Sequence, residues 1–346
     1  MSARMLLNQA LRVLGRRRDL GAAIAAAPVV APEVEEPQPP LVFLPGMLDR
    51  ATAAVPGFAP LSHERATARA AKVVHAEVRR LDLHDALVHP AGVDLWGAAL
   101  RHRPLGRGDL RGPVVRLDRA VFCRSSVATR YFGHWLLDAC STAMLAEAGE
   151  ATIIDVNPAW PHAAAYAAAF GITPTPAPLA RVGRLSLWQD HALGPHKRAR
   201  LAVMRDRLAA AFGTPDPAGR RILLRRPGGG ATRQIANEAA LEARLAQRGF
   251  TPCDPGALDA PALWRRLAGA ATVVSLEGSH MNHLVLALPP GARVLALIPG
   301  DRFTLIQAGY AQAARLRFGF VVLDPGAAGY RADCDAVERT LDLLEA

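Results

Sequence analysis

The stretch ATVVSLEGSHMNHLVLALPPGARVLALI, residues 271–298, indicates the fold class. Residues 271–276 and 293–298 are short apolar runs rich in β-branched side chains, as in strands that are buried on both faces. A turn that contains one glycine (residues 277–280) and an apolar segment of helical length (residues 281–288) separate the two runs. Strand, turn, helix and strand in this order are typical of a parallel α/β sheet.

The same alternation extends outward in both directions from this unit. It predicts further strands at residues 86–88, 114–117, 120–123, 152–156, 221–226 and 251–253, and helices at residues 135–148, 161–170, 196–212, 237–247, 258–267 and 336–346. A chain of 346 residues is long enough for two domains. We expect a basic segment with a linker rich in Pro and Glu at residues 1–40, one α/β domain at 41–195 and a second at 196–346.

The composition excludes several classes of protein. Hydrophobic residues make up 51% of the chain, which excludes disorder over most of its length. No apolar run approaches the ~20 residues of a membrane-spanning helix, so we expect a soluble, cytoplasmic protein. The net charge of +10 leaves a nucleic-acid partner open. The arginines are dispersed along the chain, and an arginine-rich composition also follows from a GC-rich genome. We therefore do not expect a nucleic acid as a partner.

The first 18 residues contain five arginines and no acid, with leucines at helical spacing. A basic amphipathic helix of this kind can lie on an anionic membrane, here the inner face. A frayed terminal helix and a signal peptide remain alternatives.

Neither cysteines nor acids form a metal motif. The four cysteines are Cys123, Cys140, Cys253 and Cys334, and no two of them form a C-x-x-C pair. We therefore interpret them as small core residues of a reducing compartment. Asp333 and Asp335 have D-x-D spacing, but a helix N-cap explains an aspartate before the last helix. No metal site is predicted.

His134 and Asp138 form the first candidate for chemistry. They are four residues apart, so on a helix they share one face. A carboxylate beside an imidazole fixes its tautomer and raises its basicity, as a general base for a hydroxyl requires. A polar pair at the start of a helix, without catalytic role, explains the spacing as well.

Two glycine-containing loops form the second and third candidates. Glu277, Gly278, Ser279 and His280 follow a buried strand, where backbone N–H groups and polar side chains can bind a phosphate. Arg225 and Arg226 precede Gly228–Gly230, and Arg233, Asn237 and Glu238 follow. Arginines around such a loop can bind a diphosphate, although a surface turn with solvated arginines has the same pattern.

Together these three segments resemble glycosyltransferase family 61, which includes enzymes of the capsular-polysaccharide type. The family's block Asn-Tyr-x-His-Trp-Leu-x-Asp is similar to residues 131–138, YFGHWLLD. Its Arg-x-x-x-Asn-Glu block corresponds to Arg233–Glu238 after Arg226, and its His-Gly-Ala-Gly-Leu-x-Asn loop to residues 277–283, EGSHMNH. The resemblance covers about residues 40–325. Glu277 stands where the family has histidine, His283 where it has asparagine, and Tyr131 where it has asparagine.

The resemblance implies a GT-B fold, with two Rossmann-like domains facing each other across a cleft and the last helix packing back on the first domain. It implies an inverting, metal-independent glycosyltransferase that uses a nucleotide-sugar, expected to be UDP-linked, and a glycan acceptor, without a further cofactor. His134 or Asp138 would be the base. Arg226 and Arg233 would bind the diphosphate, Gly278 and Ser279 would offer N–H groups, and the pocket would be lined by Asn237, Glu238, Glu277 and His280.

Three alternatives stay open beside this interpretation. A non-catalytic anion or nucleic-acid binder would use the arginines for phosphate contacts. A dinucleotide-dependent enzyme is disfavoured because no G-x-G-x-x-G motif is present. A degenerate transferase that only binds a glycan is consistent with the glutamate at position 277.

Overall fold

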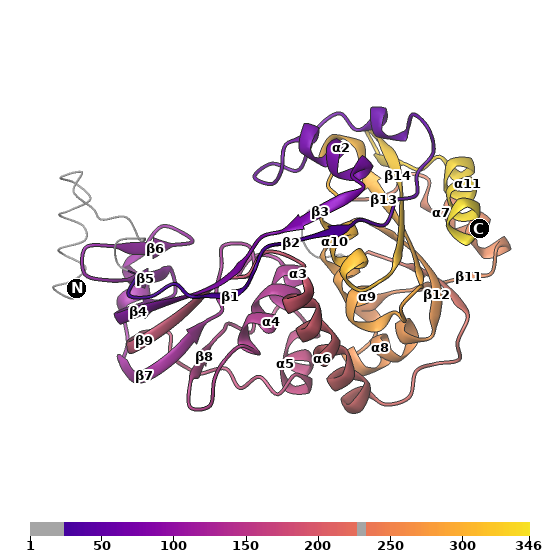
Figure 1. Ribbon diagram of the computed structural model, residues 1–346. Helices are drawn as coiled ribbons and strands as arrows, with labels where there is room; N and C mark the ends of the chain where they lie inside the picture. The colour runs from indigo at the N-terminus through magenta and orange to yellow at the C-terminus, as the bar shows by residue number, and fades with distance from the viewer. Residues whose placement is uncertain (1–23, 227–232) are drawn as a thin grey trace. The chain divides into compact units, whose positions relative to one another are not determined.

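The computed structural model describes residues 24–226 and 233–346, and its chain forms two compact units (Figure 1). Unit 1 contains the described residues up to Val34 together with Ala76–Ala192, and unit 2 contains Glu35–His75 and Leu193–Ala346. The chain therefore passes from one unit to the other three times. The basic segment of residues 1–18 and the glycines of the loop at 228–230 lie outside the described residues.

Residues 35–75, most of which we expected in the first domain, cluster with unit 2. Leu41, Leu44 and Leu48 of this segment are buried, and the N–H of Val42 donates to the Phe318 carbonyl at 3.0 Å. The expected linker at residues 31–40 contains strand β2 (Val34–Pro37), which pairs with β3 (Lys72–His75). Apolar patterns reveal that a segment is buried but not which sheet covers it.

Unit 1 is built on a mixed seven-stranded sheet in the order β6-β5-β4-β9-β7-β8, with β1 beside β4. β7 runs parallel to β8 and β9, whereas the other neighbours are antiparallel. This differs from the parallel sheet of the expected Rossmann-like domain. The strands are β1 (Val29–Ala31), β4 (Val78–His89), β5 (Gly92–Asp94), β6 (Ala99–Arg101), β7 (Val115–Phe122), β8 (Ala151–Ile153) and β9 (Ala180–Gln189).

The helical part of unit 1 is shorter than the sequence pattern predicts. α3 (Phe132–His134) continues into a π-helical turn (Trp135–Ala139) and α4 (Cys140–Ala143), so the helix ends five residues before position 148. α5 (Ala163–Ala169) follows β8. The indole of Trp135 lies 5.9 Å from the Phe132 ring and 6.0 Å from the Trp160 indole, between ring centroids. This aromatic cluster anchors the π turn in the core of the unit.

Unit 2 contains the sheet that the first stretch of sequence predicts, in the order β11-β10-β12-β13-β14-β15. The first five strands are parallel and only β15 is antiparallel. The α/β class is confirmed. The strands are β10 (Arg220–Leu224), β11 (Phe250–Cys253), β12 (Ala270–Leu276), β13 (Arg293–Pro299), β14 (Arg317–Gly326) and β15 (Gly329–Arg331).

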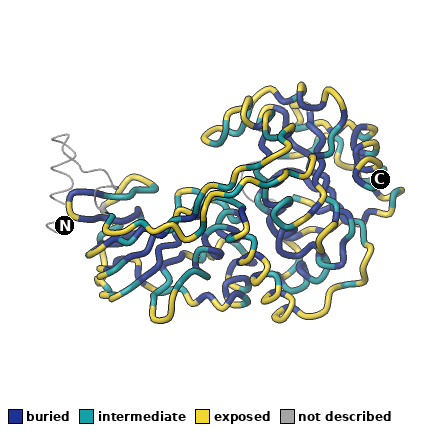
Figure 2. Tube along the Cα trace, in the orientation of Figure 1, coloured by how far each residue is buried: buried dark blue, intermediate teal, exposed yellow. Residues whose placement is uncertain are grey.

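Helices cover both faces of the parallel strands, whose residues are largely buried (Figures 1 and 2). α7 (Glu238–Gln247) contacts α11 (Cys334–Glu345), and a second group is formed by α6 (Pro195–Phe212), α8 (Ala260–Ala268) and α9 (Asn282–Ala287). The last helix, α11, was expected on the first domain but packs on β13 and β14, where Arg293 Nε donates to the Leu344 carbonyl at 3.0 Å. Its apolar residues Val337, Leu341 and Leu344 are fully buried there.

Two findings bear on the predictions from composition. Among the described residues, none of the helices combines the length and the apolar character that crossing a membrane requires. All four cysteines are free, and Cys123, Cys140 and Cys253 are buried. Burial raises the pKa of the Cys123 thiol far above its usual range, which is consistent with a core residue.

Candidate functional site

The predicted loops lie at the point where the strand order of unit 2 reverses. After β10 the chain moves outward to β11 and then returns to the other side of β10 as β12. Loops that follow such a pair of parallel strands leave the sheet in opposite directions, and α/β sheets bind their ligands at this position. Arg226 follows the end of β10 by two residues, and Glu277 comes directly after β12.

Arg226, Arg233 and Glu277 meet at this switch point. Arg233 Nη1 donates to the backbone carbonyl of Glu277 at 2.9 Å and forms an ion pair with its carboxylate. Arg226 Nη1 lies 3.3 Å from the same carbonyl oxygen. The Glu277 side chain is only 8% exposed and that of Arg233 11% exposed. The glutamate that departs from the family pattern is therefore neutralised by an arginine that the same pattern contains.

The electrostatic balance of this cluster favours an anion. Burial lowers the pKa of Arg226 to about 10, and the positive charges of Arg233 and Arg302 contribute, whereas Glu277 opposes them. Arg226 thus interacts with two further guanidinium groups and with the carboxylate of Glu277. Repulsion between partly buried like charges is relieved when an anion binds among them, because each guanidinium then gains a charged hydrogen-bond acceptor.

Arg302 and Glu64 belong to this neighbourhood but were not among the predicted residues. Arg302 ends the short 3₁₀ turn that follows β13 (Gly300–Arg302). Buried Glu64, from α2 (Leu61–Arg69), has a raised pKa, mainly because of burial and partly because of the charge of Glu277. The rule that polar groups cluster at the carboxyl ends of parallel strands could have found Arg302, whereas nothing in the sequence connects Glu64 with the site.

Gly278 and His280 belong to the same loop and are closely packed. A Cβ on Gly278 would collide with Arg226 Nη1 and would lie 3.0 Å from His280 Nδ1. His280 Nε2 is 2.9 Å from Ser275 Oγ. Burial, with Arg226 and Arg233 nearby, lowers the pKa of His280 to about 3, so its imidazole is neutral at physiological pH. Ser279 is half-buried and begins the 3₁₀ turn Ser279–Met281 before α9.

Asn237 and Glu238 have other surroundings. The Asn237 amide donates to the Ala332 carbonyl and accepts from the Ala332 N–H, both at 2.9 Å. It therefore joins the segment before α7 to the segment before α11. Glu238 is exposed in the first turn of α7. The structure therefore holds Asn237 on Ala332, whereas Arg226 and Arg233 contact Glu277.

In unit 1 the structure brings His134 and Asp138 together. His134 Nδ1 lies 2.7 Å from Asp138 Oδ2, and the two side chains are 15% and 28% exposed. Asp138 lies in the π-helical turn, which widens the helix locally and is frequent at functional sites. The carboxylate on Nδ1 orients the ring and fixes its tautomer, which makes Nε2 the basic nitrogen.

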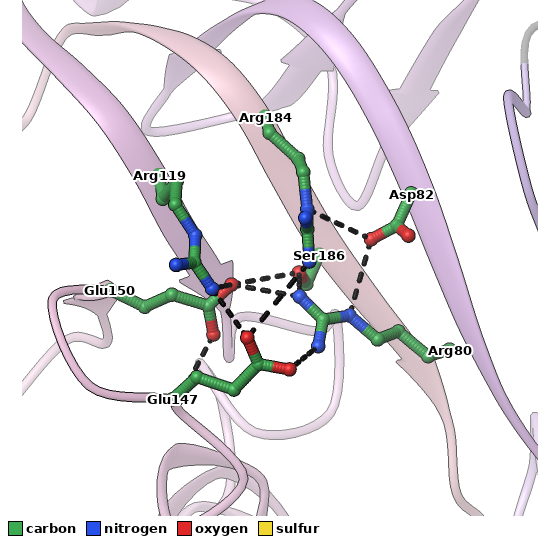
Figure 3. Close-up of polar contacts among 7 residues, drawn as sticks. All are labelled: Arg80, Asp82, Arg119, Glu147, Glu150, Arg184 and Ser186. Atoms are coloured by element: carbon green, nitrogen blue, oxygen red, sulfur yellow. Dashed lines mark hydrogen bonds and ion pairs between the residues drawn. The ribbon is translucent and has the colours of Figure 1, made fainter.

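A second cluster of charged side chains in unit 1 has a different character (Figure 3). Arg80 Nη2 donates to Glu150 Oε1 at 2.8 Å and to Ser186 Oγ at 2.7 Å, whereas Nε pairs with Asp82 and Nη1 with Glu147. Arg119 and Arg184 complete the cluster. Three arginines here face three carboxylates. This balanced network fixes the loop before β8 to strands β4, β7 and β9.

The described residues contain no group of three His, Cys, Asp or Glu side chains that could hold a metal ion.

Comparisons with known proteins support the family resemblance. The family model described as Glycosyltransferase 61 matches residues 132–295, just under half of the chain, a span that includes every predicted site residue. No curated protein matches. A solved structure of a mutant flavo di-iron protein from Thermotoga maritima is similar over 66% of this chain, with 12% identity and a TM-score of 0.29. That similarity carries no argument, and the chain spans about half (54%) of that protein's length.

Proposed function

We propose that this protein is a glycosyltransferase that moves a sugar from a nucleotide-sugar to a hydroxyl of a glycan acceptor. The observation that carries the proposal is the contact of Arg226 and Arg233 with Glu277 at the switch point of the parallel sheet, with Arg302 close enough to repel Arg226. The match to the family model supports transferase chemistry. In this proposal unit 2 binds the donor and unit 1 the acceptor.

The donor's diphosphate would bind among the three guanidinium groups. Arg226 and Arg233 would donate to phosphate oxygens, while the Gly278 and Ser279 backbone offers further N–H groups. Glu277 would exchange its pairing with Arg233 for hydrogen bonds from the ribose or sugar hydroxyls. Neutral His280 would keep the wall of the site uncharged. The negative charge on the leaving diphosphate is then stabilised by arginines without a metal, and one missing donor in such a site raises the barrier by ~2.7–4 kcal/mol.

The reaction would be a single displacement with inversion. His134, oriented by Asp138, accepts the proton of the acceptor hydroxyl at Nε2 as that oxygen forms a bond to C1 of the sugar. The bond from C1 to the diphosphate oxygen breaks, and the nucleoside diphosphate leaves with the electron pair. Atoms and charge balance without a further cofactor. Synthesis of a capsule-type polysaccharide at the cytoplasmic face of a membrane, reached through residues 1–18, is the setting that we propose.

The first test is a thermal-shift panel with UDP, GDP, CMP, NAD and a short DNA duplex, each with and without EDTA. At a hundredfold excess over the dissociation constant, a ligand stabilises the folded state by ~2.7 kcal/mol, which shifts the melting temperature of a domain of roughly 150–250 residues by several degrees. We expect such a shift with UDP, unaffected by EDTA. Arg233→Gln should abolish it.

Arg225→Gln is the matched control, because Arg225 is adjacent to Arg226 in sequence but pairs with Glu242 of α7 at 2.7 Å. It removes the same charge and should preserve the shift. Stabilisation by DNA alone, lost in salt, would refute the transferase and favour the nucleic-acid binder. UDP binding without any transfer, unchanged by His134→Ala, would favour a degenerate glycan-binding homologue.

A further inference from the structure

A cavity of about 280 Å³ lies in unit 1 at the carboxyl ends of the parallel strands β7 and β8. Cys123 and Arg124 follow β7, and the segment of residues 154–158 follows β8. The volume is just below the ~300–1,000 Å³ of typical small-molecule pockets, so it suits one sugar unit better than a longer chain. Its lining includes Arg124, Asp155, Asn157, Trp135 and Trp160.

Arg124 distinguishes this cavity from an ordinary surface hollow. Its side chain is only 6% exposed, yet only Nη2 makes an ion pair, with Asp155 Oδ1 at 2.7 Å. Nε and Nη1 are buried without a hydrogen-bond partner. Within the described part of the chain, no other arginine has two such nitrogens. Buried donors of a charged group are nearly always satisfied in native proteins, so this guanidinium is prepared for an acceptor that enters the cavity.

The surroundings of Arg124 do not neutralise it fully. Asp155 is 50% exposed, so water screens its charge and it is free to turn toward solvent. Burial lowers the pKa of His102 and the charge of Arg124 lowers it further, which keeps this imidazole neutral. One buried guanidinium therefore faces one screened carboxylate, in contrast to the balanced network around Arg80.

The remaining walls fit a sugar ring that carries the anion. Trp135 Nε1 donates to the Asp155 carbonyl at 2.6 Å, which holds the segment after β8 in place. Trp160 is half-buried and offers an amphipathic aromatic wall. Asn157 accepts the Ala159 N–H at 2.9 Å through its side-chain oxygen, so its amide group is held at the rim. Trp135 follows His134 directly in the chain, which ties the cavity to the proposed base.

We propose that this cavity binds a carboxylate or phosphate carried by the acceptor, so that the acceptor is an anionic glycan. The statement that the ligand is a glycosyl acceptor rests on the proposed function. The anion site itself is independent of that function. Arg124 receives the anion on its unpaired nitrogens, Trp160 packs on the ring, and Asp155 is the counter-ion that the ligand displaces.

The test compares three small probes with the full-length chain by ligand-observed NMR or calorimetry: methyl β-D-glucuronide, glucose 6-phosphate and the neutral methyl β-D-glucoside. A hydrogen bond to a charged group is worth about a tenfold preference or more. We expect the glucuronide or the phosphate to bind at least about tenfold more tightly than the glucoside. Whichever probe is preferred identifies the anion as carboxylate or phosphate.

Three variants locate the effect. Arg124→Gln should remove the preference for the charged probe, whereas Arg116→Gln, an exposed arginine of β7 outside the cavity lining, should preserve it. Asp155→Asn should tighten binding of the charged probe but not of the glucoside, and this half-exposed position keeps the test decisive even if Arg124→Gln fails to fold. Equal affinity of the unmodified protein for charged and neutral probes, or a preference that persists in Arg124→Gln, would overturn the inference.

The UDP thermal shift, measured on the same samples, separates the two proposals. A UDP shift without any charge preference would overturn the anion site alone and leave the transferase standing. A charge preference that depends on Arg124, in a protein that no nucleotide stabilises, would support the anion site and refute the transferase.

Discussion

At the residue scale, Glu277 illustrates what a neighbour does to a charged side chain. A carboxylate next to a diphosphate would repel it, and the sequence left its role open. The structure pairs Glu277 with Arg233, places Arg226 at the Glu277 carbonyl and brings Arg302 near Arg226. The site therefore contains its own counter-ion, Glu277, before any ligand enters. The positive charge of the arginines exceeds the negative charge of this glutamate.

Gly278→Ala tests how closely this site is packed. The added methyl group would displace the Arg226 guanidinium and crowd the His280 ring, whereas the extended backbone at this glycine accepts alanine. We expect UDP affinity, measured by calorimetry, to fall by about tenfold or more, since a hydrogen bond to a charged group is lost. Gly108→Ala, where a Cβ meets nothing within 4 Å, is the control. Unchanged affinity in Gly278→Ala would contradict the role of Arg226.

At the scale of elements, α2 shows how a polar side chain can fasten a helix. Glu64 accepts the N–H of Leu305 at 2.8 Å and the hydroxyl of Thr304 at 3.2 Å. This joins α2 to the start of α10 (Ile306–Ala313). A charged residue on the buried face of a helix departs from simple amphipathic patterning, and only the distant partner explains it.

The buried position of Glu64 makes stability depend on pH. Its folded-state pKa is raised above the ordinary value of 4.5, chiefly by burial. The folded protein therefore holds this proton more tightly than the unfolded chain, and the corresponding stability is present below pH 4.5 and lost as pH rises through the folded pKa. In urea unfolding, we expect the stability of the unmodified protein relative to Glu64→Gln to decline from about pH 4.5 toward neutrality. The stability of the unmodified protein relative to an exposed control, Glu33→Gln, should show no such trend. If the stability of Glu64→Gln changes with pH in the same way as that of the unmodified protein, the role of Glu64 is refuted.

At the scale of the whole molecule, unit 2 is assembled from two separate parts of the sequence. Residues 35–75 supply α2, β3 and the segment around Val42, which bridges to Gly319 of β14. The N–H of Thr52 donates to the Gly300 carbonyl at 2.7 Å. A construction by consecutive domains, as the sequence suggested, would leave these edges of the sheet without partners.

Fragments of the chain test this assembly. Residues 193–346 alone would expose the partners of Val42 and Glu64, so we expect them to unfold without cooperativity in urea, followed by circular dichroism. A Cβ on Gly194 would lie 3.0 Å from the His75 Cβ, so a short linker can join residue 75 to residue 193. The joined fragment 35–75/193–346 should unfold cooperatively and retain the UDP shift. Equal cooperativity of both fragments would mean that residues 35–75 are dispensable for unit 2.

Much of the fold and part of the site follow from local patterns. The strands of unit 2 are apolar runs long enough to be buried on both faces, and the loops after them carry Arg226, Glu277 and Gly278. The apolar pattern and the turn residues were therefore sufficient to predict these strands and loops. The spacing of His134 and Asp138 sufficed to predict their pairing, because a helical repeat brings positions four apart together. These features depend on interactions within a few residues.

Other features were decided only by tertiary structure. The mixed sheet of unit 1, the docking of residues 35–75 and the packing of α11 on β13 and β14 depend on which apolar faces meet, and an apolar pattern does not name its partner. The same holds for Arg124 and for Asn237. Arg124 has two buried nitrogens without a hydrogen-bond partner, and Asn237 is held by the backbone of Ala332. Both outcomes depend on segments that are distant in sequence. Local chemistry thus determined the elements and the residue types of the site, whereas long-range packing determined which of those residues face a ligand.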